Sequence, residues 1–173
     1  MRSLKVDSIR IRTGGQTGVD RAALQLAVEL GIPYCGWCPR GGWAEDSTTP
    51  PGIRERYPLL AETPSADPRQ RTAWNVRDSN ATLILSKGES ESSGTQFTRA
   101  CAELVFERPI CVVDIEHSQS LTDARHWLVQ LLVASATPTL DLNIAGPRES
   151  EIPGITSDAS RALRAILFDS MTE

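Results

Sequence analysis

Short apolar runs alternate with amphipathic stretches along this chain, and that alternation constrains the fold more than any other feature. The runs Leu83–Leu85 and Ile110–Val113 contain no strongly polar residue, so both faces of each strand should be buried. Strands of this kind are typical of a parallel sheet covered by helices on both sides. We therefore expect an α/β fold, with a doubly wound, mainly parallel sheet and helices on both faces.

The periodicity predicts the order of the elements. Strands are expected at 8–13, 33–37, 82–86, 110–114 and 139–145, and helices at 19–30, 68–80, 94–108, 122–135 and 153–168. Thr17 with Asp20 is expected to cap the first helix, Asp67 the second, and Ser93 with Gln96 the third. The stretch that follows the second strand, from about residue 37 to residue 66, has little periodicity. A loop of that length is usually functional or a lid.

The first strand is unusual, because Ile9 and Ile11 alternate with Arg10 and Arg12. A central strand of a doubly covered sheet would be apolar on both faces. Two explanations are open: one face of this strand is exposed toward a partner subunit, or the arginines lie at its solvent-facing beginning.

Composition narrows the classes of partner. The 173 residues favour a single domain over 1–173, and a net charge of -4 offers no general field for nucleic acid or an anionic membrane. No run approaches the length of a membrane span. Four cysteines in a chain of this length suit a reducing compartment better than a disulfide framework. We expect an unexported, cytoplasmic protein.

Three loops should meet at one edge of the sheet, where the carboxyl ends of parallel strands form a common crevice. They span 14–20, 87–95 and 145–150 and are rich in glycine and polar residues. In the first, the amides of residues 16–19 begin a helix and could hold a phosphate or similar oxyanion. Gly18→Glu is then expected to abolish anion binding and leave the fold intact. Each loop also has a structural explanation, as a tight turn, a helix cap or a surface turn.

A bare anion would bind weakly at such a helix start. The helix terminus contributes about 0.3–1 kcal/mol, or up to about 2 when partly buried, and each hydrogen bond to a charged group adds about 1.5–3 kcal/mol. Lost translational and rotational freedom costs about 4 kcal/mol or more. A useful ligand should therefore carry a ring system or further anionic groups. Trp37, Trp43 and Trp74 flank the crevice and could stack on a ring, although ordinary packing explains each of them as well.

Common motifs fit poorly. The spacing G-G-x-x-G at Gly14 disfavours a dinucleotide site, and Val19 and Asp20 after Gly18 disfavour the phosphate loop of nucleoside triphosphatases. Cys35 and Cys38 form a C-x-x-C pair, but no helical pattern follows to lower a thiol pKa. No set of metal ligands is evident, and no metal site is expected.

Several stretches together resemble the molybdenum carrier family, which includes molybdenum cofactor carrier proteins. They are GGQTGVDRAAL at 14–24, GWCPRGGWAED at 36–46, YPL at 57–59, RTAWNVRDSNATLIL at 71–85, SGTQFT at 93–98 and NIAGPRES at 143–150. The resemblance covers most of the chain.

The resemblance implies a Rossmann-like fold, homo-oligomers (dimers or tetramers), and binding, protection and transfer of the molybdenum cofactor (molybdopterin) to apo-molybdoenzymes without catalysis. The cargo is a phosphorylated pterin, and Arg40 and Arg148 are candidates to balance its charge. The cofactor-binding candidates are Gly14, Gly15, Gln16, Thr17, Gly18, Asp20, Arg40, Asn75, Ser92, Ser93, Gly94, Thr95, Asn143, Gly146, Pro147 and Arg148.

An alternative is a nucleotide-binding enzyme or sensor related to the nucleoside-monophosphate phosphoribohydrolases of the lonely-guy type. Those carry a P-G-G-x-G-T-x-x-E segment whose glutamate supports hydrolysis. Aligning Gly94 and Thr95 with its G-T puts Thr98 where the glutamate belongs, so hydrolysis is disfavoured. Single-strand DNA-loading proteins of the same fold are also disfavoured, because the chain is acidic and lacks a basic, aromatic-rich track.

Overall fold

The computed structural model describes residues 8–88 and 92–168, so the part of the second loop at 89–91 lies outside it. The strands are β1 (Ile9–Arg12), β2 (Tyr34–Cys35), β3 (Trp37–Cys38), β4 (Ala61–Glu62), β5 (Ala81–Ser86), β6 (Ile110–Asp114) and β7 (Leu140–Ala145). The α-helices are α1 (Val19–Leu30), α2 (Pro68–Arg77), α3 (Ser93–Ala100), α4 (Ser118–Ala134) and α5 (Ile155–Leu167). Two 3-10 turns, η2 (Arg40–Gly42) and η3 (Gly52–Glu55), and a π-helical turn, η4 (Cys101–Val105), complete the order.

Five strands form one sheet in the order β2-β1-β7-β5-β6, and all of its pairs are parallel. The predicted Rossmann-like α/β fold is confirmed. In the middle of the sheet, β5 lies between β7 and β6, with Leu83 opposite Ile144 on one side and Cys111 on the other. The run Leu83–Leu85 is fully buried, as its composition predicted. The same expectation for Ile110–Val113 is wrong, because β6 is the edge strand and Val112 is 37% exposed.

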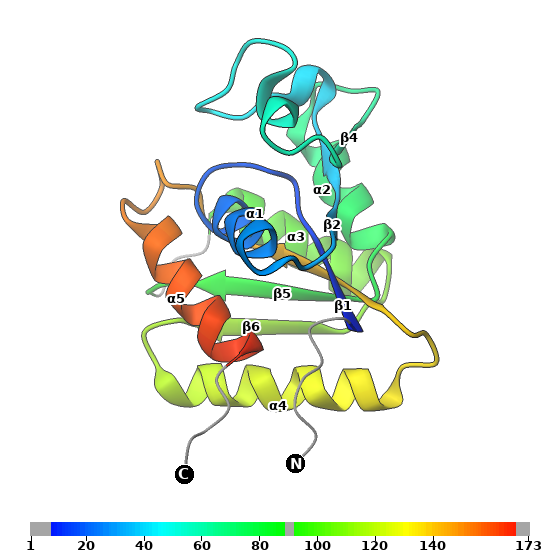
Figure 1. Cartoon of the computed structure of the whole chain (residues 1–173), viewed down its shortest axis with the longest axis vertical. Helices are drawn as coiled ribbons and strands as arrows, with labels where there is room; N and C mark the ends of the chain where they lie inside the picture. The colour runs from blue at the N-terminus through cyan, green and yellow to red at the C-terminus, as the bar shows by residue number, and fades with distance from the viewer. Residues whose placement is uncertain (1–7, 89–91, 169–173) are drawn as a thin grey trace.

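Two helical layers cover the sheet (Figure 1). The larger core joins α1, α4 and α5 to one face, through residues such as Leu26, Leu128 and Leu163. A smaller cluster on α2 and the α3–η4 helix, built on Val76, Cys101 and Ala102, packs near Ile110 of β6. The sheet is therefore covered from both sides by helices that the strand–helix alternation had predicted.

The arginines of β1 find their counter-charge on the neighbouring strand. Ile9 and Ile11 point into the larger core, whereas Arg10 donates two hydrogen bonds of 2.6 Å to Asp141 of β7. The Arg12 guanidinium lies 3.5 Å from the same carboxylate. The alternation thus places a cross-strand ion pair on one sheet face, where the Arg10 side chain is 44% exposed. An exposed face is what the first of the two explanations requires, and a partner subunit at that face stays a prediction.

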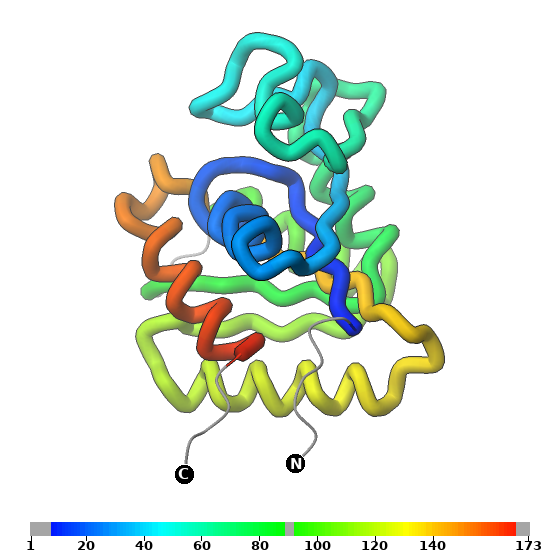
Figure 2. Tube along the Cα trace, viewed as in Figure 1, coloured from blue at the N-terminus to red at the C-terminus, as the bar shows by residue number. Residues whose placement is uncertain are grey.

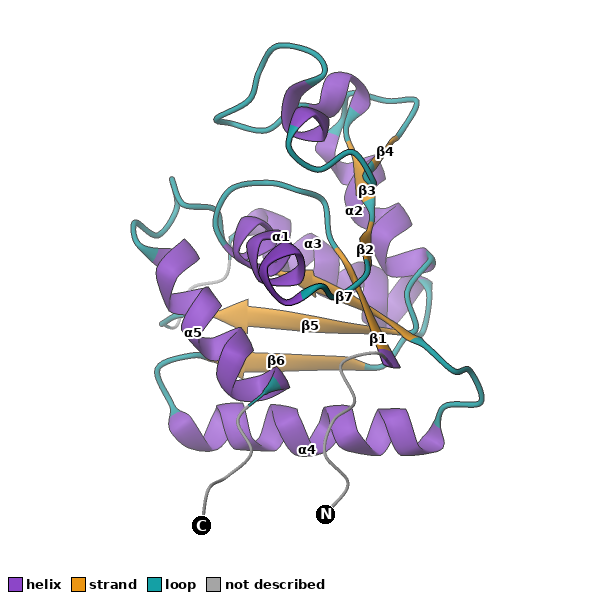
Figure 3. Cartoon of the chain, in the orientation of Figure 1, coloured by secondary structure: helices purple, strands orange, loops and turns teal. Residues whose placement is uncertain are grey.

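Residues 36–66 form a separate lobe above α1 (Figure 2). The predicted strand at 33–37 divides at Gly36, where a Cβ would lie 1.9 Å from the carbonyl oxygen of Thr13, and the chain leaves the main sheet there. Short strands β3 and β4 then pair in parallel as a second sheet (Figure 3). Ala44, Ile53, Tyr57 and Leu60 pack together with Leu24 of α1, so this long segment has its own small core.

Helix ends differ from the expectations at several points. Gly18, not Thr17, is the N-cap of α1, and Ser92, not Ser93, caps α3 by accepting from the Thr95 amide. Helix α4 begins four residues earlier than predicted, at Ser118. The Asp67 cap and Pro68 at the first position of α2 are confirmed. No helix among the described residues is long and apolar enough to cross a membrane.

Candidate functional site

The first and third loops meet at the carboxyl edge of the sheet. The Val19 amide donates to the Pro147 carbonyl oxygen at 3.1 Å, and the Glu149 amide donates to Thr17 Oγ1 at 3.3 Å. The loop after β5 leaves the neighbouring strand at the same edge, although residues 89–91 are not described. The sequence thus placed two loops correctly beside each other.

Three of the four amides in the expected oxyanion seat at 16–19 are engaged within the chain, and this corrects the prediction. Gln16 donates its amide to Asp20 at 3.3 Å, and Thr17 donates its amide to the Gln16 side-chain oxygen at 3.1 Å. The Val19 amide donates to Pro147, as described above. Groups of the chain itself therefore take up most of the amides that a phosphate would need.

Gly18 is required for packing between the loops. Its φ is +77°, and a Cβ there would lie 2.2 Å from the Pro147 carbonyl oxygen. The expectation that Gly18→Glu leaves the fold intact is therefore wrong, because any side chain would collide with the third loop. Gly146 is similarly confined, since its Cβ would lie 2.5 Å from the Leu85 carbonyl oxygen.

Gly14 and Gly15 also serve close packing. A Cβ on Gly14 would lie 2.0 Å from a guanidinium nitrogen of Arg71, and one on Gly15 would lie 2.9 Å from Leu60. Arg71 crosses the loop to reach Asp20, with 3.1 Å between Nη1 and Oδ2. Burial raises the pKa of the Asp20 carboxyl above its ordinary value, and the charge of Arg71 opposes that effect. This pair joins α2 to the start of α1.

Asn75 and Asn143 are buried, with 2% and 3% exposure, and hold the backbone or a neighbouring strand. Asn75 accepts from the Trp37 amide at 2.8 Å and donates to the Trp37 carbonyl oxygen at 2.9 Å. Asn143 donates to Thr82 at 3.3 Å. Both line a cavity of about 10 Å³ together with Asp20 and Thr98. A space of that size holds about one water molecule, so these two amides do not face a heterocycle in this structure.

The start of α3 is open to solvent. Ser92 caps the helix, Ser93 and Gly94 in the first turn are exposed, and Thr95 is buried. Among the predicted loops, this helix start is the one whose first turn faces solvent. In the third loop, Pro147 is buried and Arg148 is half-buried, with its amide donating to Glu151 at 2.9 Å.

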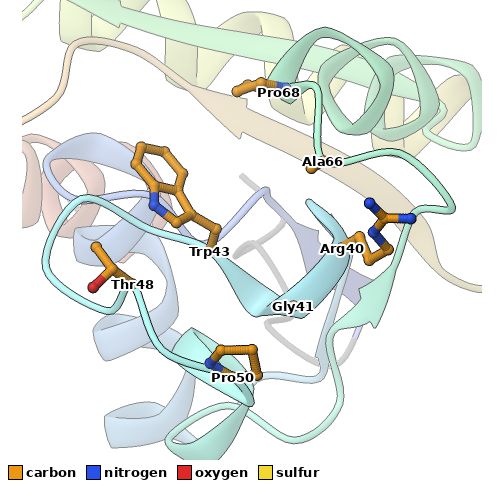
Figure 4. Close-up of a pocket in the computed structure, with 7 residues that line it drawn as sticks. All are labelled: Arg40, Gly41, Trp43, Thr48, Pro50, Ala66 and Pro68. Atoms are coloured by element: carbon orange, nitrogen blue, oxygen red, sulfur yellow. The ribbon is translucent and has the colours of Figure 1, made fainter.

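A pocket of about 400 Å³ lies between the 36–66 lobe and the start of α2 (Figure 4). Arg40, Gly41, Trp43, Thr48 and Pro50 line it from the lobe, and Ala66 and Pro68 line it from the helix start. Within the described residues, the Arg40 guanidinium makes no ion pair or hydrogen bond, and its side chain is exposed. Trp43 and Arg40 thus both line this one pocket.

Trp37 and Trp74, the other two tryptophans predicted to flank the crevice, pack against each other. Trp37 and Trp74 form an edge-to-face pair with 4.8 Å between ring centroids, and Trp37 Nε1 donates to Asp78 at 2.7 Å. Of the three tryptophans predicted to flank the crevice, Trp43 alone lines this pocket. The sequence around Trp43, GGWAED, contains nothing that would single it out from Trp37 and Trp74 as a pocket residue.

A second pocket of about 440 Å³ is lined by the predicted site residues Thr17 and Gly18. Sequence reasoning missed Arg21 and the acidic residues that share it, Glu45, Asp46 and Glu149. The buried Arg21 side chain donates to both oxygens of Asp46, at 2.8 and 2.9 Å. Acidic residues in a loop give no sequence signal that distinguishes a site from a solvated turn, which is why these residues were not predicted.

The cysteines make no disulfide. Burial, with a smaller contribution from Glu62, raises the pKa of the Cys38 thiol to about 11, and burial also raises the pKa of Cys35. These thiols are therefore neutral at physiological pH, which is opposite to what redox catalysis needs. No group of three residues able to hold a metal ion occurs within 8–88 and 92–168.

Comparison with known proteins agrees with the fold. The crystal structure of the Putative molybdenum carrier protein from Syntrophus aciditrophicus SB matches with a TM-score of 0.78 and 36% sequence identity, covering 93% of this chain and 96% of that one. No curated protein matches the chain. The profile of the Circularly permutated YpsA SLOG family matches residues 11–167. This chain therefore belongs to the Circularly permutated YpsA SLOG family.

Proposed function

We propose that this protein binds a phosphorylated pterin that carries molybdenum, the molybdenum cofactor, and passes it unchanged to apo-enzymes. The similarity to a protein named as a molybdenum carrier, extending over 93% of the chain, supports a molybdenum-related role. We extend that role to a pterin and its phosphate because of the chemistry of the pocket at Trp43 and Arg40.

The observation that carries the proposal is the pairing of Trp43 and Arg40 in one pocket at the start of α2 (Figure 4). Its volume of about 400 Å³ lies within the range typical of small-molecule sites. An indole stacked on a planar ring is worth about 1–3 kcal/mol, and a guanidinium can bind phosphate through two parallel hydrogen bonds. The two side chains therefore match the two ends of a phosphorylated heterocycle.

The residues around Thr98 favour carriage over hydrolysis. Thr98 is 4% exposed, and its hydroxyl donates to the Gly94 carbonyl oxygen at 3.0 Å within the helix. The nearby Asp20 carboxylate is engaged by Arg71 and the Gln16 amide. The cavity of about 10 Å³ between them admits no nucleoside. A nucleotide hydrolase would need both a free carboxylate and room for the sugar.

We extend the proposal to location and assembly. Four free thiols fit the reducing conditions of the cytoplasm. We also propose that the carrier works as a homo-oligomer, a dimer or tetramer, which light scattering of the purified protein would measure.

The experiment is a titration of the purified protein with molybdopterin, followed by fluorescence and by transfer to an apo-molybdoenzyme. Trp43→Ala should weaken binding about fivefold or more, because stacking is worth about 1–3 kcal/mol. Arg40→Ala should weaken it about tenfold or more, because a hydrogen bond to a charged group is worth about 1.5–3 kcal/mol. Arg56→Ala is the matched control, since it removes the same charge from the same lobe, where Arg56 lies 5.9 Å from the Tyr57 ring.

The alternative function is tested by measuring whether nucleotides raise the thermal stability of the protein. A ligand at about 100 times its dissociation constant should stabilise the protein by about 2.7 kcal/mol. Stabilisation by AMP or GTP, with no retention of molybdopterin, would overturn the carrier proposal in favour of a nucleotide-binding enzyme or sensor. Unchanged molybdopterin affinity in both pocket variants would remove the pocket from the binding site.

A further inference from the structure

One carboxylate joins three segments that are distant in the sequence. Glu45 lies in the turn at Ala44–Ser47, whose ends are paired by backbone hydrogen bonds of 3.1 and 2.9 Å. Its carboxylate accepts hydrogen bonds from the Thr17 hydroxyl of the first loop, and from the Ser150 hydroxyl at 2.7 Å and the Ser150 amide at 3.4 Å. The Glu45 amide also donates to the Gln16 side chain at 2.9 Å. The 36–66 lobe is thereby fastened to both loops.

The donors around this carboxylate are those that bind an oxyanion. Two hydroxyl groups and one amide converge on the Glu45 oxygens, and the charge of Arg148 also acts on them. Partial burial disfavours the charged form, but the hydrogen bonds from Thr17 and Ser150 outweigh that effect and keep the pKa of Glu45 below its ordinary value. Glu45 is therefore an anion at neutral pH, held by donors from two loops.

Space for a ligand adjoins this contact. The pocket of about 440 Å³ is lined by Thr17, Glu45 and Ser150 and reaches Arg21. The Arg21 side chain is 6% exposed, and its Nε has no acceptor among the described residues. The two terminal nitrogens of this guanidinium are engaged by Asp46 and the Gly15 carbonyl oxygen, so Nε is an unsatisfied donor behind the wall of the pocket, which is unusual for a buried group. This is independent of the bonds that Glu45 makes.

We propose that Glu45 is an autoinhibitory latch: its carboxylate occupies a site for a tetrahedral oxyanion, formed by Thr17 and Ser150, and an anionic ligand group must displace it. The displacing group would be a phosphate or molybdate oxyanion, in a pocket separate from the one at Trp43 and Arg40 where the cargo's phosphate is proposed to bind. Displacement breaks no covalent bond. It exchanges one set of hydrogen bonds for another and releases the Glu45 carboxylate from Thr17 and Ser150, while the Glu45 amide keeps its bond to the Gln16 side chain.

The test measures binding of inorganic phosphate and of molybdate to the full chain by isothermal titration calorimetry. Glu45→Ala should bind at least one of the two anions about tenfold or more tightly than the unmodified protein, because it removes both the competing charge and its hold on the donors. Glu45→Gln keeps the size of the side chain and should change affinity in the same direction by a smaller factor. It covers the case in which the alanine variant does not fold.

Two controls separate the latch from a general change of charge. Glu55→Ala removes the same charge from the same lobe at an exposed position and should leave anion affinity unchanged. Adding Ser150→Ala to Glu45→Ala should abolish the gain. If neither Glu45 variant binds phosphate or molybdate more tightly than the unmodified protein, or if Glu55→Ala produces the same gain, the latch is refuted.

The outcome is distinct from a failure of the carrier proposal. Tight phosphate binding by Glu45→Ala in a protein that retains no molybdopterin would leave the latch standing and remove the carrier function. Molybdopterin binding that depends on Trp43 and Arg40, with no effect of Glu45 on either anion, would do the reverse.

Discussion

Replacing Gly18 with alanine should destabilise the protein more than the same change at Gly31, a glycine of positive φ whose surroundings are open. Gly18 has φ +77° and ψ −130°, a sparsely populated conformation that costs a residue with a side chain about 1–3 kcal/mol. Its Cβ would also lie 2.2 Å from the Pro147 carbonyl oxygen and 2.8 Å from the Arg148 backbone. The third loop must then move, which strains packing by about 1–3 kcal/mol and endangers the Val19–Pro147 hydrogen bond, worth about 0.5–1.5 kcal/mol.

Gly31 supplies the control without a neighbour. It has φ +68° and ψ 23°, in the left-handed region, and a Cβ there meets nothing within 4 Å, so Gly31→Ala should cost only the about 1–2 kcal/mol of that conformation. The two variants should differ by about 1.5–4.5 kcal/mol in unfolding free energy, which is at least about 3 °C in Tm for a chain of this size.

Urea unfolding followed by circular dichroism would measure the difference. Equal losses in the two variants would show that contact with Pro147 adds nothing to the cost of a side chain at Gly18.

Two further predictions concern stability. Asn75→Ala should lower the unfolding free energy by about 2–4 kcal/mol, because it leaves the Trp37 amide and carbonyl without their partner; a urea midpoint within error of the unmodified protein would contradict this. Hydrogen bonds from Arg77 and Trp37 hold the pKa of Asp78 below its ordinary 3.8, so its contribution is present above that pH and is lost as the pH falls through the folded pKa. Asp78→Asn should therefore flatten the fall of Tm below about pH 4, and an unchanged acid profile would count against it.

The sequence predicted the main sheet well because its strands are short, apolar and separated by strong turn residues. Strand β6 occupies the predicted 110–114, and the Asp67–Pro68 signal began α2 at the predicted residue. Errors occurred where tertiary contacts decide the local structure. Thr17 is drawn away from its expected capping role because its hydroxyl donates to Glu45, a residue 28 positions away.

The candidate site was predicted in outline and less well in detail. The first and third loops adjoin as expected, but the amides of Gln16, Thr17 and Val19 are satisfied by groups whose positions only the folded chain reveals. The sequence suggests only that Asn75 is a polar residue near a crevice. Nothing in it indicates that the Asn75 side chain hydrogen-bonds the backbone of Trp37. Arg40 lines a pocket whose other wall, at Ala66 and Pro68, is some 26 residues further along.

The two bonds of Asn75 to Trp37 bear on how fast a molecule could enter the pocket at Trp43. They tie α2 to β3, and the Arg40 amide also donates to the Ser65 carbonyl oxygen at 3.0 Å, so hydrogen bonds link the two walls of that pocket. We therefore expect entry there without a hinge motion. Association should accordingly be a single-step, second-order process whose rate rises linearly with ligand concentration and does not reach a plateau.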